Sequence, residues 1–194
     1  MDADLLDDLM TGPLDLFCSR YIFDRTPHVF QDDWIGYLSW KAKLGSLLNV
    51  DSHDLVMIGS AAVGVSLSPT KNLRPFDDES DIDIAVVSQR HFDIAWRHLR
   101  SLGSSQLSMP AVVRDAIRDH KKHYVYLGVI ATDQILVHLP FGPDWQRHIA
   151  SMAKDAPTIG RNINMRLYHD SDALRFYHIE GLLRIRNQRL EAQE

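Results

Sequence analysis

Apolar residues recur every three or four positions along much of the chain, the spacing that gives an α-helix one apolar side. Glycine and proline interrupt the pattern. Gly12-Pro13 ends the first stretch, and Pro27 ends the second because it lacks an amide proton. Asp32 or Asp33 can cap the third. The pattern predicts helices over residues 3–10, 14–24, 34–48, 91–102, 110–121, 145–152 and 171–190.

Shorter apolar runs, rich in β-branched residues, are typical of strands. The first run ends abruptly in Gly59-Ser60 and is followed by a loop-rich stretch over residues 64–80. A tight turn at Thr132-Asp133 is expected to join the third predicted strand to the fourth. The predicted strands are residues 54–60, 81–87, 123–130, 134–139 and 162–168.

The order of these elements is helices first and then strands mixed with helices, which favours an α+β or mixed α/β fold. We expect a small mixed sheet with helices on one face, N-terminal helices packed around it and a closing C-terminal helix. The chain of 194 residues is in the size range of a single domain. Within it we distinguish an N-terminal helical segment (1–50), a core (51–170) and a C-terminal helix (171–194).

Composition excludes several classes of protein. Hydrophobic residues make up 45% of the chain and charged residues 24%, which are ordinary values for a globular protein. No apolar run is long enough to span a bilayer, so we expect no membrane contact. The chain begins MDADLLDDLM, acidic where a signal peptide is basic, and we expect a cytoplasmic protein. The single cysteine, Cys18, excludes an internal disulfide and a multi-cysteine zinc site.

Charge is unevenly distributed. A net charge of −5 argues against a protein that coats nucleic acid by bulk electrostatics. The first 33 residues carry eight aspartates against two arginines, and residues 160–189 carry six arginines against three acidic residues. The basic rear can serve a polyanionic ligand, or it can be a solvated helix face.

The candidate chemistry lies where the first two predicted strands meet. Side chains alternate along a strand, so Asp81 and Asp83 point to the same side while Ile82 points into the core. Two ionised carboxylates repel each other unless a divalent cation lies between them, and hard oxygen ligands suit Mg²⁺ or Mn²⁺. Gly59-Ser60 leaves backbone amides free for a phosphate and adds a hydroxyl donor. Together these residues describe a site for a metal and a triphosphate.

The stretch IGSAAVGVSLSPTKNLRPFDDESDIDIAVVS resembles the signature of the polymerase-β-type nucleotidyltransferase superfamily, in which Gly-Ser is followed by Asp-x-Asp on the adjacent strand. The resemblance covers about residues 54–88, and the element order supports it up to residue 168. It implies a nucleotidyltransferase-like fold and metal-dependent transfer of a nucleoside monophosphate from a nucleoside triphosphate. Small stand-alone bacterial members are frequent in toxin–antitoxin and phage-defence modules.

The resemblance also implies roles for particular residues. Asp81 and Asp83 would be catalytic and would bind Mg²⁺ or Mn²⁺. Gly59, Ser60 and Ser80 would bind the nucleotide. The long segment between the two halves of the signature carries two cations, Lys71 and Arg74. In the functional interpretation Lys71 or Arg74 neutralises the β- and γ-phosphates or closes over them as a lid. In the alternative interpretation both are solvated loop charges.

Catalytic members of the superfamily place a third carboxylate on a later strand, and here the predicted strands 134–139 and 162–168 contain no acid. His138 or Asn164 can face the site instead, and Asp133 lies in the turn before one strand. Three interpretations stay open. They are an enzyme with two carboxylates, an enzyme with an unusual base such as His138, and a nucleotide-binding protein without catalysis.

The acceptor is also open: a protein side chain, an RNA or tRNA end, a second nucleotide or a small molecule. Arg166 can contact phosphates from the polar side of its strand, and Arg184 or Arg186 can contact the acceptor. Two alternatives belong to other classes. One is a catalytically silent nucleotide or RNA sensor, and the other is a regulatory subunit whose acidic N-terminal helices dock onto a protein partner.

Overall fold

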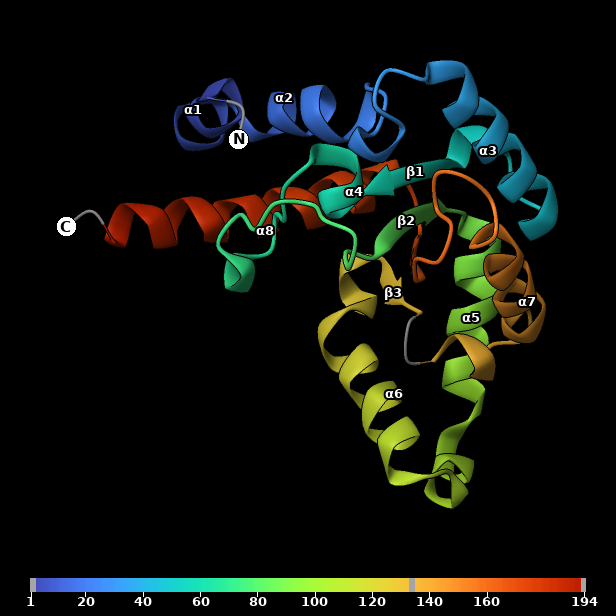
Figure 1. Ribbon diagram of the computed structural model, residues 1–194. Helices are drawn as coiled ribbons and strands as arrows, with labels where there is room; N and C mark the ends of the chain where they lie inside the picture. Colours follow the sequence, from blue (N-terminus) through green and yellow to red (C-terminus); the bar gives the residue numbers. More distant parts are fainter. Residues whose placement is uncertain (1–2, 133–134, 193–194) are drawn as a thin grey trace.

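A four-stranded mixed sheet forms the centre of the computed structural model, which describes residues 3–132 and 135–192 (Figure 1). The strand order is β1-β2-β4-β3, with β1 antiparallel to β2, β2 parallel to β4 and β3 antiparallel to β4. The strands are β1 (Leu55–Ile58), β2 (Ile82–Val87), β3 (Val129–Ala131) and β4 (Ile163–Tyr168). The mixed α+β class expected from the sequence is confirmed.

The predicted helices all form, although the second is split. It begins as α2 and continues as a π-helical turn, Ser19–Phe23. The predicted cap Asp33 accepts a hydrogen bond from the Gly36 amide at the start of α3. The helices are α1 (Ala3–Thr11), α2 (Leu14–Cys18), α3 (Trp34–Leu48), α4 (Gly59–Val63), α5 (Gln89–Ser101), α6 (Ala111–His123), α7 (Gly142–Met152) and α8 (Ser171–Glu191).

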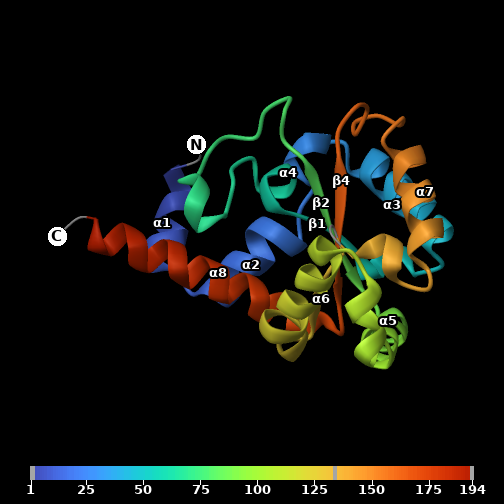
Figure 2. The ribbon, with the colours of Figure 1, turned by 90° about the horizontal axis from the view of Figure 1, so that it is seen from below.

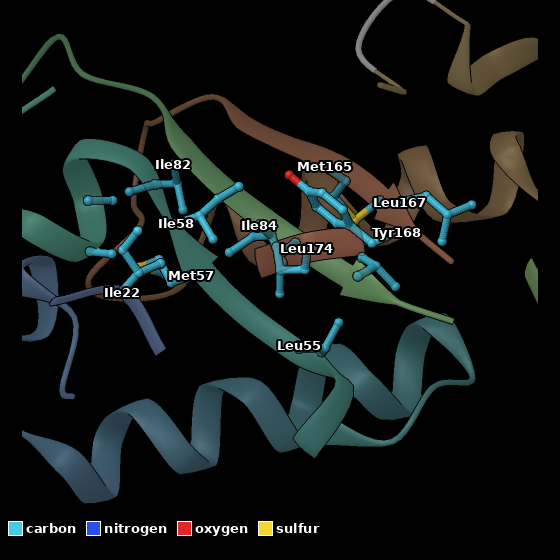
Figure 3. Close-up of a cluster of buried hydrophobic side chains, with 14 of the residues drawn as sticks. Ile22, Leu55, Met57, Ile58, Ile82, Ile84, Met165, Leu167, Tyr168 and Leu174 are labelled. Carbon is cyan, nitrogen blue, oxygen red and sulfur yellow. The ribbon is translucent and has the colours of Figure 1, made fainter. Parts of the chain in front are cut away.

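The register of the strands gives the sheet two different faces. Ile84 lies between Met57 of β1 and Met165 of β4, and residues in register share a face. This face is apolar and buried. Figure 3 shows hydrophobic side chains from both faces: Ile84 and Met165 belong to this face, and Tyr168 belongs to the other. Leu174 of α8 and Ile22 of the π-helical turn are part of the same buried cluster. The opposite face carries Asp83 and the residues in register with it.

Helices cover both faces of the sheet, so the expectation of helices on one face was wrong. Figure 2 shows the sheet nearly edge-on, with α3, α5 and α7 on one side and α1, α2, α4 and α8 on the other. The face that carries Asp83 is also largely apolar, and helices therefore shield it from water. Its residues Ala85, Val129 and Tyr168 are completely buried.

The strands predicted over residues 123–130 and 134–139 are corrected by the structure. His123 is the last residue of α6, and β3 is confined to Val129–Ala131. Leu136–His138 forms a 3₁₀ turn. Most of the predicted Thr132-Asp133 turn lies outside the described residues, but the Thr132 hydroxyl donates to the Met165 carbonyl. The apolar pattern was misleading because Val125 and Leu127 pack against the core, partly buried, from a 3₁₀ turn, Val125–Leu127.

The acidic N-terminal segment is bound to the basic C-terminal helix. Arg186 of α8 donates hydrogen bonds to the Leu9 and Gly12 carbonyls, at the end of α1. Arg175 donates to the Asp15 carbonyl. Part of the basic rear therefore satisfies helix-end carbonyls within the molecule. None of the helices in the described residues combines the length and apolar character needed to cross a membrane.

Candidate functional site

A cleft of about 790 Å³ opens on the face of the sheet that carries Asp83. One end of it, the inner end, is lined by Gly59, Ser60, Lys71 and Asp83. Its remaining walls come from β4, from the chain after α6 and from α8. Four of the residues singled out in the sequence for nucleotide and metal binding therefore lie together.

Gly59 allows the Asp83 carboxylate to lie directly against the backbone. Asp83 is in register with Ile58, the last residue of β1, and Gly59 follows with φ +67°, a conformation that favours glycine. A Cβ at Gly59 would stand 2.9 Å from Asp83 Oδ2. The chain can therefore turn from β1 into α4 beside the carboxylate only with glycine here, and Ser60 follows immediately.

Asp83 carries a negative charge that is only partly balanced. Burial raises the pKa of Asp83, and the nearby charge of Asp81 adds to the rise. The Arg166 guanidinium, a hydrogen bond from Asn164 and the more distant Lys71 oppose it. Asn164 is in register with Asp83, and Arg166 lies two residues further along β4 on the same face. The inner end is thus a half-buried carboxylate with cations beside it.

Asp81 stands next to this site without lining the cleft. It is half-buried and precedes β2 by one residue. Among the described residues no three carboxylate, histidine or cysteine side chains gather into a group that could hold a metal ion. A cation bound here would have at most the two carboxylates of the Asp-x-Asp pair, with its remaining ligands coming from water or from a bound molecule.

Arg74 and Ser80 belong to a network around Asp77 and are not among the residues that line the cleft. Arg74 Nη2 lies 3.0 and 2.9 Å from the two carboxylate oxygens of Asp77, and Ser80 Oγ donates to Oδ1 at 2.8 Å. Arg161 donates to the main-chain carbonyls of Asp77 and Ser80. These contacts hold the loop before β2, and of the two loop cations only Lys71 reaches the cleft.

The expected third carboxylate is replaced on β4 by Asn164. His138 lies in the 3₁₀ turn and is not among the cleft residues, while Asp133 lies outside the described residues. The sequence reasoning missed Glu180 of α8, which lines the cleft with Tyr177 and Arg184. The spacing 177, 180, 184 places these three side chains on one side of a helix, so helical periodicity could have grouped them from the sequence alone.

Residues of α8 and β4 form another part of the cleft wall. Arg166 Nη1 donates to the Tyr177 hydroxyl at 2.8 Å, with its guanidinium over the same ring. Burial lowers the pKa of His178 to about 4, and Arg166 adds to the decrease. His178 is therefore neutral at pH 7, and its buried Nε2 has no hydrogen-bond partner among the described residues.

Comparison with protein-family models, with curated proteins and with solved structures finds no significant match. What the cleft binds therefore has to be inferred from its own side chains. They supply a half-buried carboxylate against a glycine turn, two cations and a hydroxyl toward the inner end, and aromatic and basic side chains toward α6 and α8.

Proposed function

We propose that this protein binds a nucleoside triphosphate with Mg²⁺ or Mn²⁺ in the cleft and transfers the nucleoside monophosphate to a hydroxyl or phosphate acceptor. The observation that carries the proposal is the position of Asp83, against Gly59 and Ser60 and beside Lys71 and Arg166. The strand that ends in Gly-Ser also neighbours the strand that carries Asp83, as the sequence resemblance implies.

The charges of the inner end suit a metal bound to phosphate. A divalent cation would offset the negative charge on Asp83, whose raised pKa reflects incomplete compensation. Mg²⁺ commonly uses one or two carboxylates and completes its shell with water and phosphate oxygens, so Asp83 with Asp81 is sufficient. Lys71 and Arg166 would bind the phosphate oxygens. The residues fit a metal that arrives with its nucleotide.

Each residue then has a defined task. The bound metal would neutralise the phosphates and polarise the α-phosphate. The Ser60 hydroxyl donates to a phosphate oxygen, and Arg166, oriented by Tyr177, stabilises charge on the phosphoryl group in transfer. The acceptor oxygen bonds to the α-phosphorus as the bond to pyrophosphate breaks. A cleft carboxylate, Asp83 or Glu180, accepts the acceptor's proton.

Asn164 favours a second candidate, a nucleotide sensor without catalysis. A neutral amide in register with Asp83 donates a hydrogen bond to it and supplies no charge for a second metal. A protein of this kind would bind the metal–nucleotide complex and release no pyrophosphate.

Pyrophosphate release distinguishes the two candidates. Each common ribonucleoside triphosphate is incubated with Mg²⁺ or Mn²⁺ and with a cell lysate as the source of acceptor. Wild type is compared with Asp83→Asn and with Asp7→Asn, an exposed control on α1. Release by wild type and control, but not by Asp83→Asn, supports the transferase. Metal-dependent binding without release supports the sensor, and absence of both contradicts the proposed site.

A further inference from the structure

We propose that the outer end of the cleft binds a single-stranded nucleic acid and that, given the proposed transferase activity, the end of this strand is the acceptor. The outer end is defined by His123, Tyr126 and Phe176, which line the same cleft as Asp83. They come from the last residue of α6, the 3₁₀ turn that follows it and α8.

Two aromatic rings at the outer end are exposed to solvent. Tyr126 is 74% exposed and Phe176 is 47% exposed. Neither ring contacts another aromatic ring within the described part of the chain. Tyr177, by contrast, packs on Tyr168 and holds Arg166. Exposed rings that line a cleft are surfaces on which bases can stack, and such stacking tolerates different sequences.

A cation beside the outer end comes from the last turn of α6. The whole α5–α6 arm, residues 88–123, carries seven Lys and Arg against three Asp, but α5 lies on the other side of the sheet from α8 (Figure 2). Lys122 precedes His123 in the last turn of α6, and it is exposed.

Arg184 differs from the other arginines of the C-terminal region. Arg175 and Arg186 bind the backbone of the N-terminal helices, and Arg161 binds the loop before β2. Arg184 is exposed and lines the cleft, and neither it nor Lys122 forms an ion pair within the described residues. Both cations are available to an anionic ligand.

A single-stranded nucleic acid fits both features at once. An acidic peptide would pair with the cations but would leave the two rings without planar partners. A single strand alternates phosphates with unstacked bases, whereas the bases of a duplex are stacked on each other. The rings of the outer end therefore favour the single strand, together with Lys122 beside that end and Arg184 in the cleft wall.

The continuity of the cleft leads from the outer end to Asp83. A strand held at Tyr126 and Phe176 would direct its end toward the inner end, where the triphosphate is proposed to bind. The terminal hydroxyl oxygen would bond to the α-phosphorus, the bond from that phosphorus to the bridging oxygen would break, and pyrophosphate would leave. The hydroxyl proton would pass to Asp83 or Glu180.

Fluorescence anisotropy with labelled 12-nucleotide RNA and DNA tests the binding, at low salt and without metal or nucleotide. We expect wild type to bind single strands more tightly than a hairpin duplex of the same length. Tyr126→Ala/Phe176→Ala should weaken binding at least tenfold. Arg184→Ala should weaken it severalfold and reduce the slope of log K against log salt by about 0.7, the contribution of one phosphate on a single strand.

Matched controls are Leu107→Ala, which removes an equally exposed side chain from the end of the α5–α6 arm, and Arg147→Ala, an exposed arginine of α7. Both should bind oligonucleotide as wild type does. The proposal is overturned if wild type binds no single strand, if duplex binds as tightly, or if the ring variants bind as tightly as their controls.

A second readout separates this proposal from the proposed function. Stabilisation of the fold by Mg²⁺ with nucleotide, measured as a rise in Tm, should persist in Tyr126→Ala/Phe176→Ala and disappear in Asp83→Asn. Asp83→Asn should keep its oligonucleotide binding, because the outer end is unchanged. If wild type binds the oligonucleotide but no metal–nucleotide complex, the result contradicts the transferase and supports the nucleic-acid surface.

Discussion

The unfavourable electrostatic energy of the site is concentrated at Asp83. Its carboxylate is half-buried, with Asp81 nearby, and Arg166, Asn164 and Lys71 offset only part of the unfavourable energy of its charge. A group whose pKa is raised by folding holds its proton more tightly in the folded state than in the unfolded state. The charged form therefore destabilises the fold, and a ligand cation would reverse this.

We expect Asp83→Asn to raise the Tm of the metal-free protein at pH 7. Because the folded state binds the Asp83 proton more tightly, the free energy of unfolding of wild type begins to fall as the pH rises above the unfolded pKa of about 4. The loss is complete above the raised folded pKa. The advantage of the variant should thus be small at acid pH and maximal at neutral pH. A gain on the order of 1 kcal/mol would raise Tm by roughly 2–4 °C. Thermal melts between pH 3 and pH 8 measure it, and an advantage that shrinks with rising pH would contradict the assignment.

Gly59 shows how closely the backbone approaches this carboxylate. Gly59→Ala must place a side chain at φ +67° and its Cβ 2.9 Å from Asp83 Oδ2. Gly160→Ala is the matched control, because it has φ +74° and nothing within 4 Å of the added Cβ. Both should be destabilised by roughly 1–3 kcal/mol for the backbone conformation. Gly59→Ala should lose more, and equal losses in denaturant melts would mean that Asp83 does not press on this glycine.

At the scale of elements, the parallel register of β2 with β4 decides which side chains meet Asp83. That register places Asn164 opposite it and Arg166 on the same face, while the antiparallel β1 ends beside it in Gly59. The same pairing aligns Ile84 with Met165 on the other face. A shift of the register by one residue would exchange the two faces. The burial of Ile84 and Met165 on one face therefore also determines that Asn164 and Arg166 lie beside Asp83 on the other.

Asn164→Asp would add a second carboxylate in register with Asp83. We expect a lower Tm without metal, since two adjacent half-buried carboxylates repel, and a larger Tm rise with Mn²⁺ than wild type shows. Gln89→Glu, at an exposed position in the first turn of α5, is the control and should leave the metal response unchanged. Equal metal responses from Asn164→Asp and wild type would show that residue 164 does not face the metal position.

The long helix α8 joins the two ends of the chain. We expect Arg186→Ala to destabilise the fold by about 2 kcal/mol, because it removes charged hydrogen bonds to the Leu9 and Gly12 carbonyls. Hydrogen exchange should accelerate in α1. Arg184→Ala, on the same helix, should leave both the stability and the exchange of α1 unchanged, and a similar loss in the two variants would contradict the anchoring role of Arg186.

At the scale of the whole molecule, the N-terminal helices are part of the core. Leu5, Leu9, Phe17 and Ile22 are buried, and α2 packs along α8. This arrangement gives the acidic segment a structural role that is independent of any protein partner. It also separates the acidic front of the molecule from the basic α5–α6 arm (Figure 1).

Deletion of residues 1–33 should therefore unfold the protein, and removal of charge alone should not. We expect the deletion variant to lose cooperative thermal unfolding in circular dichroism, because it exposes part of the core. Asp4→Asn/Asp7→Asn, two exposed positions of α1, should keep a Tm within a few degrees of wild type. A deletion variant that folds normally would contradict this structural role and support the alternative in which the acidic segment is a separable docking element.

The sequence by itself determined three of the four strands, the residues of the inner end and every helix but one: α4, which begins at Gly59 where the sequence predicted the end of a strand. These follow from local chemistry: apolar spacing defines a helix side, Gly-Ser ends a strand, and alternation presents Asp83 opposite to Ile84. The short β3 was misplaced, because three residues carry too little pattern to separate a strand from a 3₁₀ turn.

Only the tertiary structure decided which of the candidate groups face one cleft. Lys71 lines it, while Arg74 and Ser80 turn to Asp77; Glu180 enters from a helix about a hundred residues later in the chain. Strand pairing and helix docking set these positions, and both depend on surfaces far apart in the sequence. Local sequence patterns do not specify contacts between residues far apart in the chain. The partner of a side chain is therefore determined only when the sheet and its covering helices are in place.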